Sequence, residues 1–201
     1  MLMAKDVFSN ELETWLRGKN KKTLSSLSEV FSEKSFAIVI LVLMSFSALP
    51  LPTGGITNIF ELISMLLALE MMLGKNTIWL PKSWGDNELG SLFKEKTIPF
   101  LIRRIRWFER FSRPRLEELI NRRYFVKIIG FLLFLFCLAA FVAPPFSGLD
   151  TLPSLGTVIL ALSVILGDVV LFLLGCAVGS VGVGLIIALG TATSQVFKHL
   201  L

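Results

Sequence analysis

Two acidic residues, Glu61 and Glu70, are the side chains of this sequence best suited to chemistry inside an apolar environment. They are the only charged residues in the apolar run at residues 56–73. Carboxylates within a membrane segment are costly and commonly belong to ion or substrate sites. A separation of nine residues corresponds to about 900° of helix rotation, which puts the two carboxylates on opposite faces. A mechanism with paired carboxylates is therefore not expected.

Structural interpretations compete with a site role for each acidic residue. Asn58 precedes Glu61 by three residues, as in a capping box. Glu70 is close enough to the end of its run to reach the membrane interface. Asp150 and Asp168 each precede an apolar run, where a carboxylate caps free amides and meets the positive end of a helix. The structural interpretation is favoured for all four acidic residues, and the site role stays open.

Two Pro- and Gly-rich breaks interrupt the apolar sequence, PLPTGG at residues 50–55 and PPFSG at residues 144–148. In transporters, breaks within helices supply backbone groups to a substrate or an ion. Tight loops outside the membrane have the same composition. The transport interpretation predicts a substrate-binding set that combines the breaks with nearby polar residues: Pro52, Thr53, Gly55, Asn58, Glu61, Pro145, Gly148, Asp150 and Thr151.

No other reactive centre is indicated. Cys137 and Cys176 lie within apolar runs, where a thiol behaves as a small hydrophobic group, and His199 lies in the tail. The sequence contains no nucleophile placed with a base, no phosphate loop, no metal-spaced cluster and no nucleic-acid motif. We therefore expect no catalytic residue, no metal, no cofactor and no nucleic-acid partner, and we predict that the protein is not an enzyme.

The composition explains why these residues are interpreted in a membrane. Hydrophobic residues make up 54% of the chain and the mean hydropathy is +0.73, which is above the range of soluble domains. Apolar runs occupy residues 36–49, 56–73, 126–144 and 155–189. Roughly 20 residues cross a bilayer, so the first two runs predict short or re-entrant helices. The last run is too long for one helix, and Gly167-Asp168 is its expected break. The predicted fold is an all-α polytopic membrane protein.

The two apolar halves repeat each other. A shift of 93 residues without a gap aligns residues 52–74 with residues 145–167, pairing Pro52 with Pro145 and Gly55 with Gly148. Each pair has the same place relative to an apolar run, which predicts two related halves. The expected organisation is a polar arm (1–35), a first membrane repeat (36–74), a basic linker (75–124), a second membrane repeat (125–192) and a tail (193–201).

Basic residues set the expected orientation. Residues 74–127 contain 13 Lys or Arg against six Asp or Glu, and the arm before Phe36 contains six basic residues. The positive-inside rule then puts both segments in the cytoplasm. The first half would cross an even number of times, which favours a parallel repeat or a re-entrant hairpin. An inverted repeat stays open, because the acidic residues of the arm weigh little in this rule.

Two amphipathic helices are predicted, at residues 26–36 of the arm and within the linker. The apolar face of the linker helix comprises Ile98, Leu101, Ile102, Ile105 and Phe108. We expect this helix to lie on anionic lipid. Its membrane-surface residues would be Arg103, Arg104, Arg106 and Arg110. The expected interfacial anchors are Trp79, Trp84 and Trp107.

Small residues at helical spacing near the end of the chain allow close helix contact: Gly175, Gly179, Ser180 and Gly184. Packing within one chain is favoured over a dimer face for these positions. We also expect the chain to form a homodimer, because small-residue faces are available.

Three stretches carry a resemblance to a known family. They are SEKSFAIVILVL, then LPLPTGGITNIFELISMLLALEMMLGKNTIWLP with Trp79 and Pro81, then RFSRPRL with Arg113 and Pro114. Over roughly residues 27–189 the chain resembles the ExoD family of bacterial exopolysaccharide synthesis proteins. The resemblance implies a multi-pass protein of the bacterial inner membrane linked to exopolysaccharide production, without catalytic residues to carry over.

The function expected from these features is support of exopolysaccharide synthesis or export. A small transporter with its site at the paired breaks is the leading hypothesis. The alternative is a membrane scaffold that recruits polysaccharide-synthesis proteins through its basic linker. An enzyme acting on a lipid-linked substrate ranks third, because no polar catalytic pair is well placed.

Overall fold

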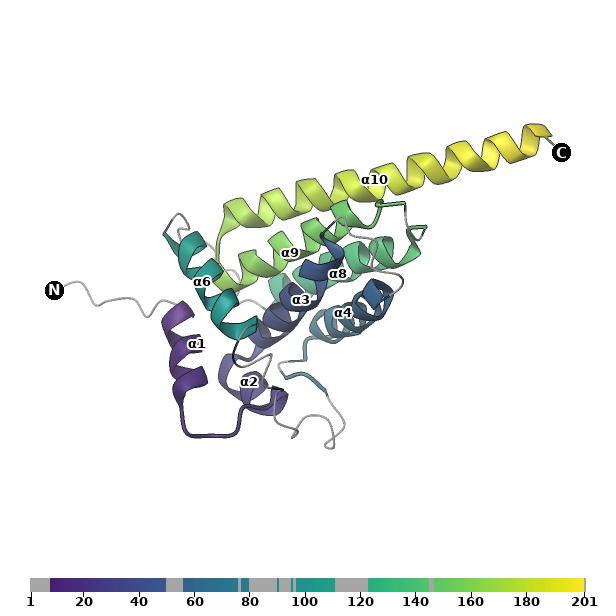
Figure 1. The fold of residues 1–201 in the computed structure, drawn as a ribbon. Coiled ribbons are helices and arrows are strands. Elements are labelled where there is room, and N and C mark those ends of the chain that lie inside the picture. The colour runs from purple at the N-terminus through teal and green to yellow at the C-terminus, as the bar shows by residue number, and fades with distance from the viewer. Residues whose placement is uncertain are drawn as a thin grey trace.

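The computed structural model describes residues 8–49, 56–75, 77–79, 90, 95, 97–110, 123–144 and 147–200. The described chain is all-α, as predicted (Figure 1). Its helices are α1 (Phe8–Arg17), α2 (Leu24–Phe31), α3 (Glu33–Ser47), α4 (Ile56–Met72), α6 (Ile98–Glu109), α8 (Arg123–Val142), α9 (Thr151–Leu166) and α10 (Val169–Leu200).

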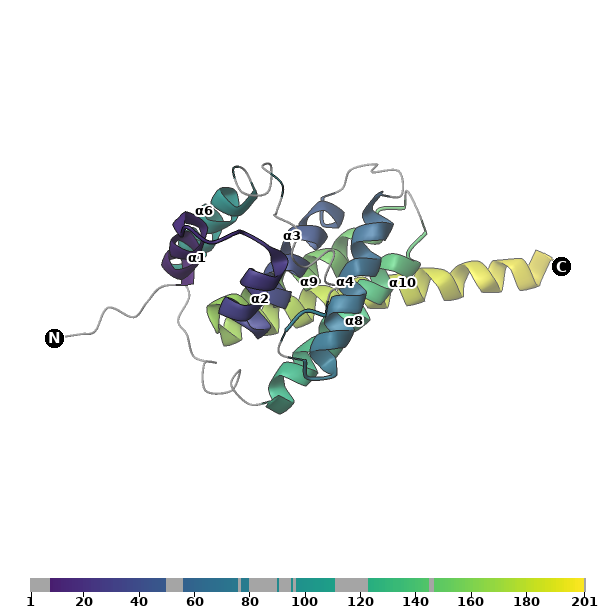
Figure 2. The same cartoon turned by 90° about the horizontal axis from the view of Figure 1, so that it is seen from below.

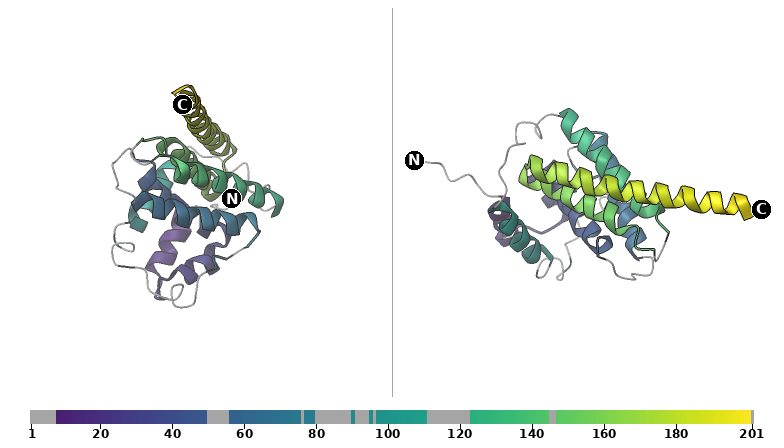
Figure 3. Two further views of the ribbon diagram at one scale, coloured as in Figure 1. Left: turned by 90° about the vertical axis from the view of Figure 1, so that its right-hand side faces the viewer. Right: turned by 90° about the horizontal axis from the view of Figure 1, so that it is seen from above.

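Helices α3, α4, α8 and α9 form a four-helix bundle. α3 packs against α4 and α9, and α8 packs against the same two helices. α4 and α9 therefore face each other across the axis of the bundle. α10 lies along α9, and its C-terminal part extends well past the other helices (Figures 1 and 3).

At one end of the four-helix bundle lie the helix ends that flank the two predicted breaks. Glu61, near the start of α4, lies beside Ser47, the last residue of α3, and within electrostatic range of Asp150, just before α9. We call this the break end and define it by these three residues. The starts of α4 and α9 thus lie at the same end of the molecule.

The opposite end, which we call the charged end, carries α1, α2 and α6 (Figures 1 and 2). Phe8 of α1 packs edge-on against Phe31 of α2, with ring centroids 5.3 Å apart. The backbone N–H of Ile78, just beyond α4, donates a hydrogen bond of 2.9 Å to Ser28 Oγ in α2. α3 and α4 therefore form a hairpin that leaves the charged end and returns to it.

Helices α8 and α10 are longer than α3, α4 and α9. Among the described residues, Tyr124–Val142 and Val169–Thr191 are the helical segments long and apolar enough to cross a membrane. α3, α4 and α9 have 15, 17 and 16 residues. At 1.5 Å per residue they are about 22–26 Å long, which is less than the roughly 30 Å of a hydrocarbon core. The short helices predicted for the first half are therefore observed.

The chain turns sharply at Ser32, where the sequence predicts a continuous helix over residues 26–36. This prediction is wrong, because α2 ends at Phe31 and Ser32 has a φ of +46°. The turn is closed by the Ser35 hydroxyl, which donates to the Ser32 carbonyl. It allows α2 to bury Leu27 and Phe31. The expected boundary between arm and first repeat, at residue 36, falls inside α3.

The predicted break at Gly167-Asp168 is confirmed. Gly167 ends α9 with a left-handed φ of +65°, a conformation that glycine adopts without strain. Asp168 Oδ1 then accepts a hydrogen bond of 2.8 Å from the N–H of Val170. The capping role predicted for Asp168 is therefore also observed.

Glycines bring α10 into close contact with the bundle. A Cβ on Gly175 would lie 2.8 Å from the backbone nitrogen of Leu160, and a Cβ on Gly179 would lie 2.2 Å from the ring of Phe136. Both positions serve packing within one chain, which is the interpretation favoured from the sequence. A Cβ on Gly184, by contrast, would meet no atom within 4 Å.

Candidate functional site

Glu61 lies on the axis of the four-helix bundle and is only 1% exposed. Its carboxylate lies beside the Ser47 hydroxyl of α3 and within electrostatic range of Asp150, which precedes α9. The carboxylate is also within electrostatic range of the thiol of Cys137 in α8. Because these groups come from or adjoin each of the other three helices, the side chain of Glu61 must point inward, toward the centre of the bundle.

Four buried oxygen atoms at this site make no hydrogen bond of good geometry with a described residue, although the Ser47 hydroxyl lies next to the Glu61 carboxyl. They are Glu61 Oε1 and the hydroxyl oxygens of Ser47, Ser64 and Ser154. A buried polar group without a partner costs roughly 1–3 kcal/mol, and a charged one costs more. Native interiors hold few such groups, so this concentration on three helices calls for a functional explanation.

The polar residues of α4 and of the second half have the same spacing. Thr57, Glu61 and Ser64 occur at i, i+4 and i+7, which puts them on one face of α4. The 93-residue shift of the sequence repeat maps these three positions onto Asp150, Ser154 and Thr157. Asp150 is half-buried and the other five side chains are buried. The two polar faces belong to the helices that lie opposite each other across the bundle axis.

Thr157 connects the second polar face to α8. Its hydroxyl donates a hydrogen bond of 2.9 Å to the Pro153 carbonyl and lies beside the buried thiol of Cys137. Cys137 and Cys176 are both free thiols. Within the described ranges, no three His, Cys, Asp or Glu side chains come together as metal ligands.

The predicted substrate-binding residues divide into four groups, of which the first, Glu61 and Asp150, meets at the break end. Pro52, Thr53, Gly55 and Pro145 lie outside the described residues. Asn58 and Thr151 are half-buried in the first turns of α4 and α9, beside the residues that point to the axis. Gly148 is exposed and has a φ of +69°.

The capping roles proposed for Asn58 and Glu61 are wrong, whereas Asp150 lies at the predicted N-cap position of α9 without a capping hydrogen bond. α4 already begins at Ile56, so Asn58 lies inside the helix and Glu61 is directed into the bundle. Asp150 makes no side-chain hydrogen bond to the first turn of α9. The structural role of Glu70 holds, because its carboxylate accepts hydrogen bonds of 2.9 Å from Lys75 Nζ and from the backbone N–H of Trp79.

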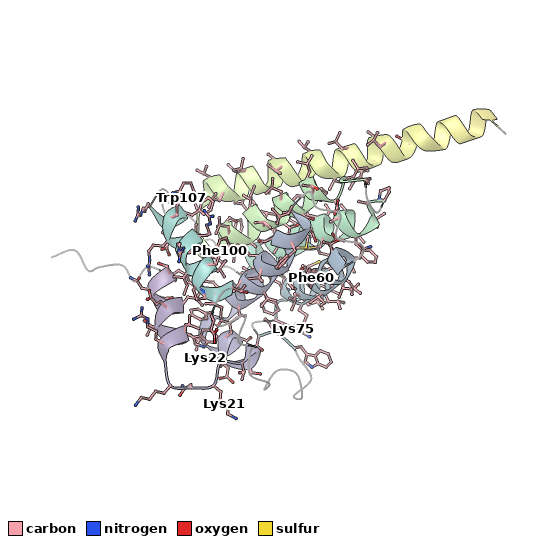
Figure 4. All side chains as sticks on the ribbon, in the orientation of Figure 1. Lys21, Lys22, Phe60, Lys75, Phe100 and Trp107 are labelled. Atoms are coloured by element: carbon pink, nitrogen blue, oxygen red, sulfur yellow. The ribbon has the colours of Figure 1, made fainter. Side chains whose placement is uncertain are left out.

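The amphipathic helix predicted in the linker is α6, but its apolar face does not lie on lipid. Ile98, Leu101, Ile102 and Ile105 are buried within the protein, and α6 packs against α1 and α9. The apolar face is therefore not available to lipid, and contact of the α6 arginines with anionic lipid stays a prediction. The outward side of α6 carries an aromatic and basic stripe, which comprises Phe100, Arg103, Arg104 and Trp107 (Figure 4).

The four predicted membrane-surface arginines have different surroundings. Arg103 and Arg104 belong to the stripe, and the Arg104 guanidinium lies 5.1 Å from the ring centroid of Phe100. Arg110 is exposed directly after α6. Arg106 instead faces α1, where its Nη2 lies 2.6 Å from Glu13 Oε2.

Ion pairs and hydrogen bonds fasten α1 to α6 at the charged end. The hydrogen bond from Arg106 lowers the pKa of the Glu13 carboxyl, and the nearby charge of Arg17 lowers it further. Ser9 donates to Glu109 twice, from its backbone N–H at 2.9 Å and from its hydroxyl at 2.6 Å. The carboxylate of Glu109 thus caps the free amides at the start of α1.

Comparisons with known proteins identify the family. The family model described as "Exopolysaccharide synthesis, ExoD" matches residues 8–188. The uncharacterized protein slr1875 from Synechocystis sp. is 25% identical over 150 residues, which cover 73% of this chain and 70% of the relative. No solved structure matches the chain. On the strength of a match that spans most of its length, the chain belongs to the ExoD family of exopolysaccharide synthesis proteins.

Proposed function

We propose that the protein is a multi-pass protein of the bacterial inner membrane that supports exopolysaccharide synthesis or export as a small, non-enzymatic transporter. Membrane insertion is supported by the two long apolar helices, α8 and α10. It is also supported by exposed large apolar side chains on α4, α8 and α10, among them Ile59, Leu66, Ile128, Phe131, Leu173, Val181 and Ile187. Apolar surface of this extent suits contact with lipid.

The observation that carries the transport proposal is the set of buried polar atoms around Glu61. Its Oε1 atom and the hydroxyls of Ser47, Ser64 and Ser154 have no partner within the described protein. A solute bound between α4 and α9 would provide these partners. Transport sites near the centre of a membrane are commonly built where two repeats meet.

The charged end is proposed to face the cytoplasm. The basic arm and the basic linker meet there, which agrees with the positive-inside rule. α3 and α8 both run from the charged end toward the break end, and this common direction supports a parallel repeat. Because α3 and α4 are short, the first half is proposed to enter the membrane as a re-entrant hairpin.

Exopolysaccharide output tests the proposal. In cells that lack the chromosomal copy, the wild-type gene and its Glu61→Gln, Ser154→Ala and Glu70→Gln variants are expressed at matched levels in the membrane fraction. We expect Glu61→Gln to reduce output to that of the empty vector and Ser154→Ala to reduce it several-fold. Glu70→Gln is the control, because Glu70 lies in the same helix but pairs with Lys75 outside the bundle.

Normal output from Glu61→Gln cells would contradict the transport site. Loss of output in Glu61→Gln and Glu70→Gln alike would also contradict it, because a general sensitivity of α4 would then explain both.

A scaffold is the second candidate, and the stripe on α6 favours it. Phe100, Arg103, Arg104 and Trp107 form an exposed aromatic and basic surface at the charged end. Such residues are enriched where proteins meet partner proteins. A scaffold predicts that Arg103→Glu with Arg104→Glu abolishes output while Glu61→Gln does not. The transport proposal predicts the reverse order of severity.

A further inference from the structure

The buried polar atoms on the bundle axis are all oxygens. Glu61 contributes a carboxylate, and Ser47, Ser64 and Ser154 contribute hydroxyls from α3, α4 and α9. Carboxylate and hydroxyl oxygens suit hard cations and protons. The same set contains no imidazole nitrogen, which Zn²⁺, Cu²⁺ and Ni²⁺ favour, and the sulfur near it is the single thiol of Cys137.

Glu61 is the fully buried carboxylate of the site, and the nearby Asp150 is half-buried. Among the described residues, Glu61 interacts electrostatically with two titratable groups. They are Asp150, which precedes α9, and the Cys137 thiol of α8. The facing residue of α3 is Ser47, which does not titrate. No Lys, Arg or His of the described chain is among these neighbours, so the described residues provide no cation for Glu61.

The repeat explains why one charge, rather than two, lies on the axis. The 93-residue shift puts Ser154 of α9 at the position equivalent to Glu61 of α4, and Thr157 at the position equivalent to Ser64. At these two positions one half contributes a carboxylate and the other half contributes hydroxyls. The carboxylate of the second half, Asp150, matches Thr57 and is only half-buried, so Glu61 is the fully buried carboxylate of the two faces. Divalent cations in proteins are usually bound by more than one carboxylate or by added phosphate groups.

We infer that the two polar faces bind one small monovalent cation, Na⁺ or H⁺, on the carboxylate of Glu61. The inference rests on the proposed transport site and names the ion that would be coupled to solute movement there. Either ion would neutralise the Glu61 carboxylate with one positive charge. The hydroxyls of Ser64 and Ser154 complete the coordination of Na⁺, or accept and donate hydrogen bonds around a protonated carboxyl.

Carbodiimide labelling of the full chain tests this inference. Dicyclohexylcarbodiimide reacts with protonated carboxyl groups in apolar surroundings, and peptide mass spectrometry distinguishes Glu61 from Glu70. The wild-type protein in lipid nanodiscs is labelled with NaCl, and with choline chloride at equal ionic strength, over a range of pH. We expect Glu61 to be labelled at least about tenfold faster than Glu70, which is paired with Lys75.

A sodium site and a proton site predict different dependences of the Glu61 labelling rate. For a sodium site, NaCl slows labelling of Glu61 relative to choline chloride at one pH, and Ser154→Ala weakens this protection. For a proton site, labelling slows as the pH rises and NaCl has no effect. A rate at Glu61 that neither Na⁺ nor pH changes would overturn the inference, as would labelling confined to other carboxyls.

Failure of the cation site can be separated from failure of the proposed function. Cation-insensitive labelling together with lost output in Glu61→Gln cells would overturn the cation and leave the transport site. Cation-sensitive labelling together with normal output in those cells would support the cation and contradict the proposed function. Because the labelling uses wild-type protein, it does not depend on the folding of a Glu61 variant.

Discussion

The two ends of the four-helix bundle treat their polar groups in opposite ways. At the charged end, Glu13 pairs with Arg106, Glu70 pairs with Lys75, and both Ser9 donors reach Glu109. At the break end, Glu61 Oε1 and three hydroxyls are buried and have no partner within the described chain. The charged end thus pairs its polar groups, including the buried Ser9, whereas the break end leaves four buried oxygen atoms without a partner.

This difference indicates that the polar groups of the charged end stabilise the fold and that those of the break end form a binding site. Polar groups that serve only the fold are normally paired when they are buried, because each unpaired group costs roughly 1–3 kcal/mol. The charged end follows that rule and organises the arm and linker. The break end departs from it, which is typical of sites that bind something other than the protein itself.

Helix packing is expected to give the largest effect, because four buried oxygen atoms of the break end make no hydrogen bond and the helices there depend on close contacts. A Cβ on Gly182 would lie 2.5 Å from Pro153 Cδ at the start of α9, whereas a Cβ on Gly184 would meet no atom within 4 Å. Gly182→Ala should lower stability by about 1–3 kcal/mol. Gly184→Ala is the matched control and should be neutral or stabilising by up to about 1 kcal/mol.

Thermal unfolding of both variants in the same detergent provides the measurement. Equal midpoints for Gly182→Ala and Gly184→Ala would mean that α10 does not hold the break end in the manner described.

Two serine substitutions should have effects of opposite sign. Ser9→Ala removes a hydroxyl that donates to Glu109 at 2.6 Å, so it should destabilise the protein by about 1 kcal/mol. Ser154→Ala removes a buried hydroxyl without a partner in the described chain, so it should stabilise the protein by a similar amount, about 1 kcal/mol. The unfolding midpoint of each variant is compared with that of the wild type, and a fall for Ser154→Ala would contradict the contrast between the ends.

Acidification should have the smallest effect, confined to the charged end. Arg106 lowers the pKa of Glu13 from its usual 4.5. A lowered pKa in the folded state means that the ion pair contributes stability above the usual value and loses it as the pH falls through the lowered one. Because Glu13 is exposed, the contribution is small. The difference in unfolding midpoint between wild type and Glu13→Gln should vanish in acid, and a difference that persists unchanged would contradict this role.

Much of the fold could be predicted from local patterns. Gly167 followed by Asp168 marks the end of α9 and the cap of α10, because each residue has a specific preference at a helix terminus. The helical spacing of Ile98, Leu101 and Ile105 correctly predicts the buried face of α6. Spacing does not reveal what covers a face, however, and here α1 and α9 cover it instead of lipid. The turn at Ser32 depends on tertiary packing of α2, which periodicity cannot detect.

The site was only partly predictable. Glu61 is conspicuous because a charge within an apolar run is unusual. Ser64 and Ser154 were missed, since a serine within an apolar helix is commonplace and hydrogen-bonds to its own backbone. The available signal was the repeat itself, because the 93-residue shift pairs polar residues at three positions spaced i, i+4 and i+7. Ser47 has a polar role only because α3 ends beside α4, which the sequence does not show.

Replacement of Glu61 by leucine tests the central claim most directly, with unfolding and exopolysaccharide output measured on the same variant. An apolar side chain of similar size removes a buried, unpaired carboxylate oxygen. The account predicts that Glu61→Leu raises stability by about 1–3 kcal/mol and abolishes output. A variant that is less stable than the wild type would show that Glu61 serves the fold, and a variant with normal output would show that the axis of the bundle is not the working site.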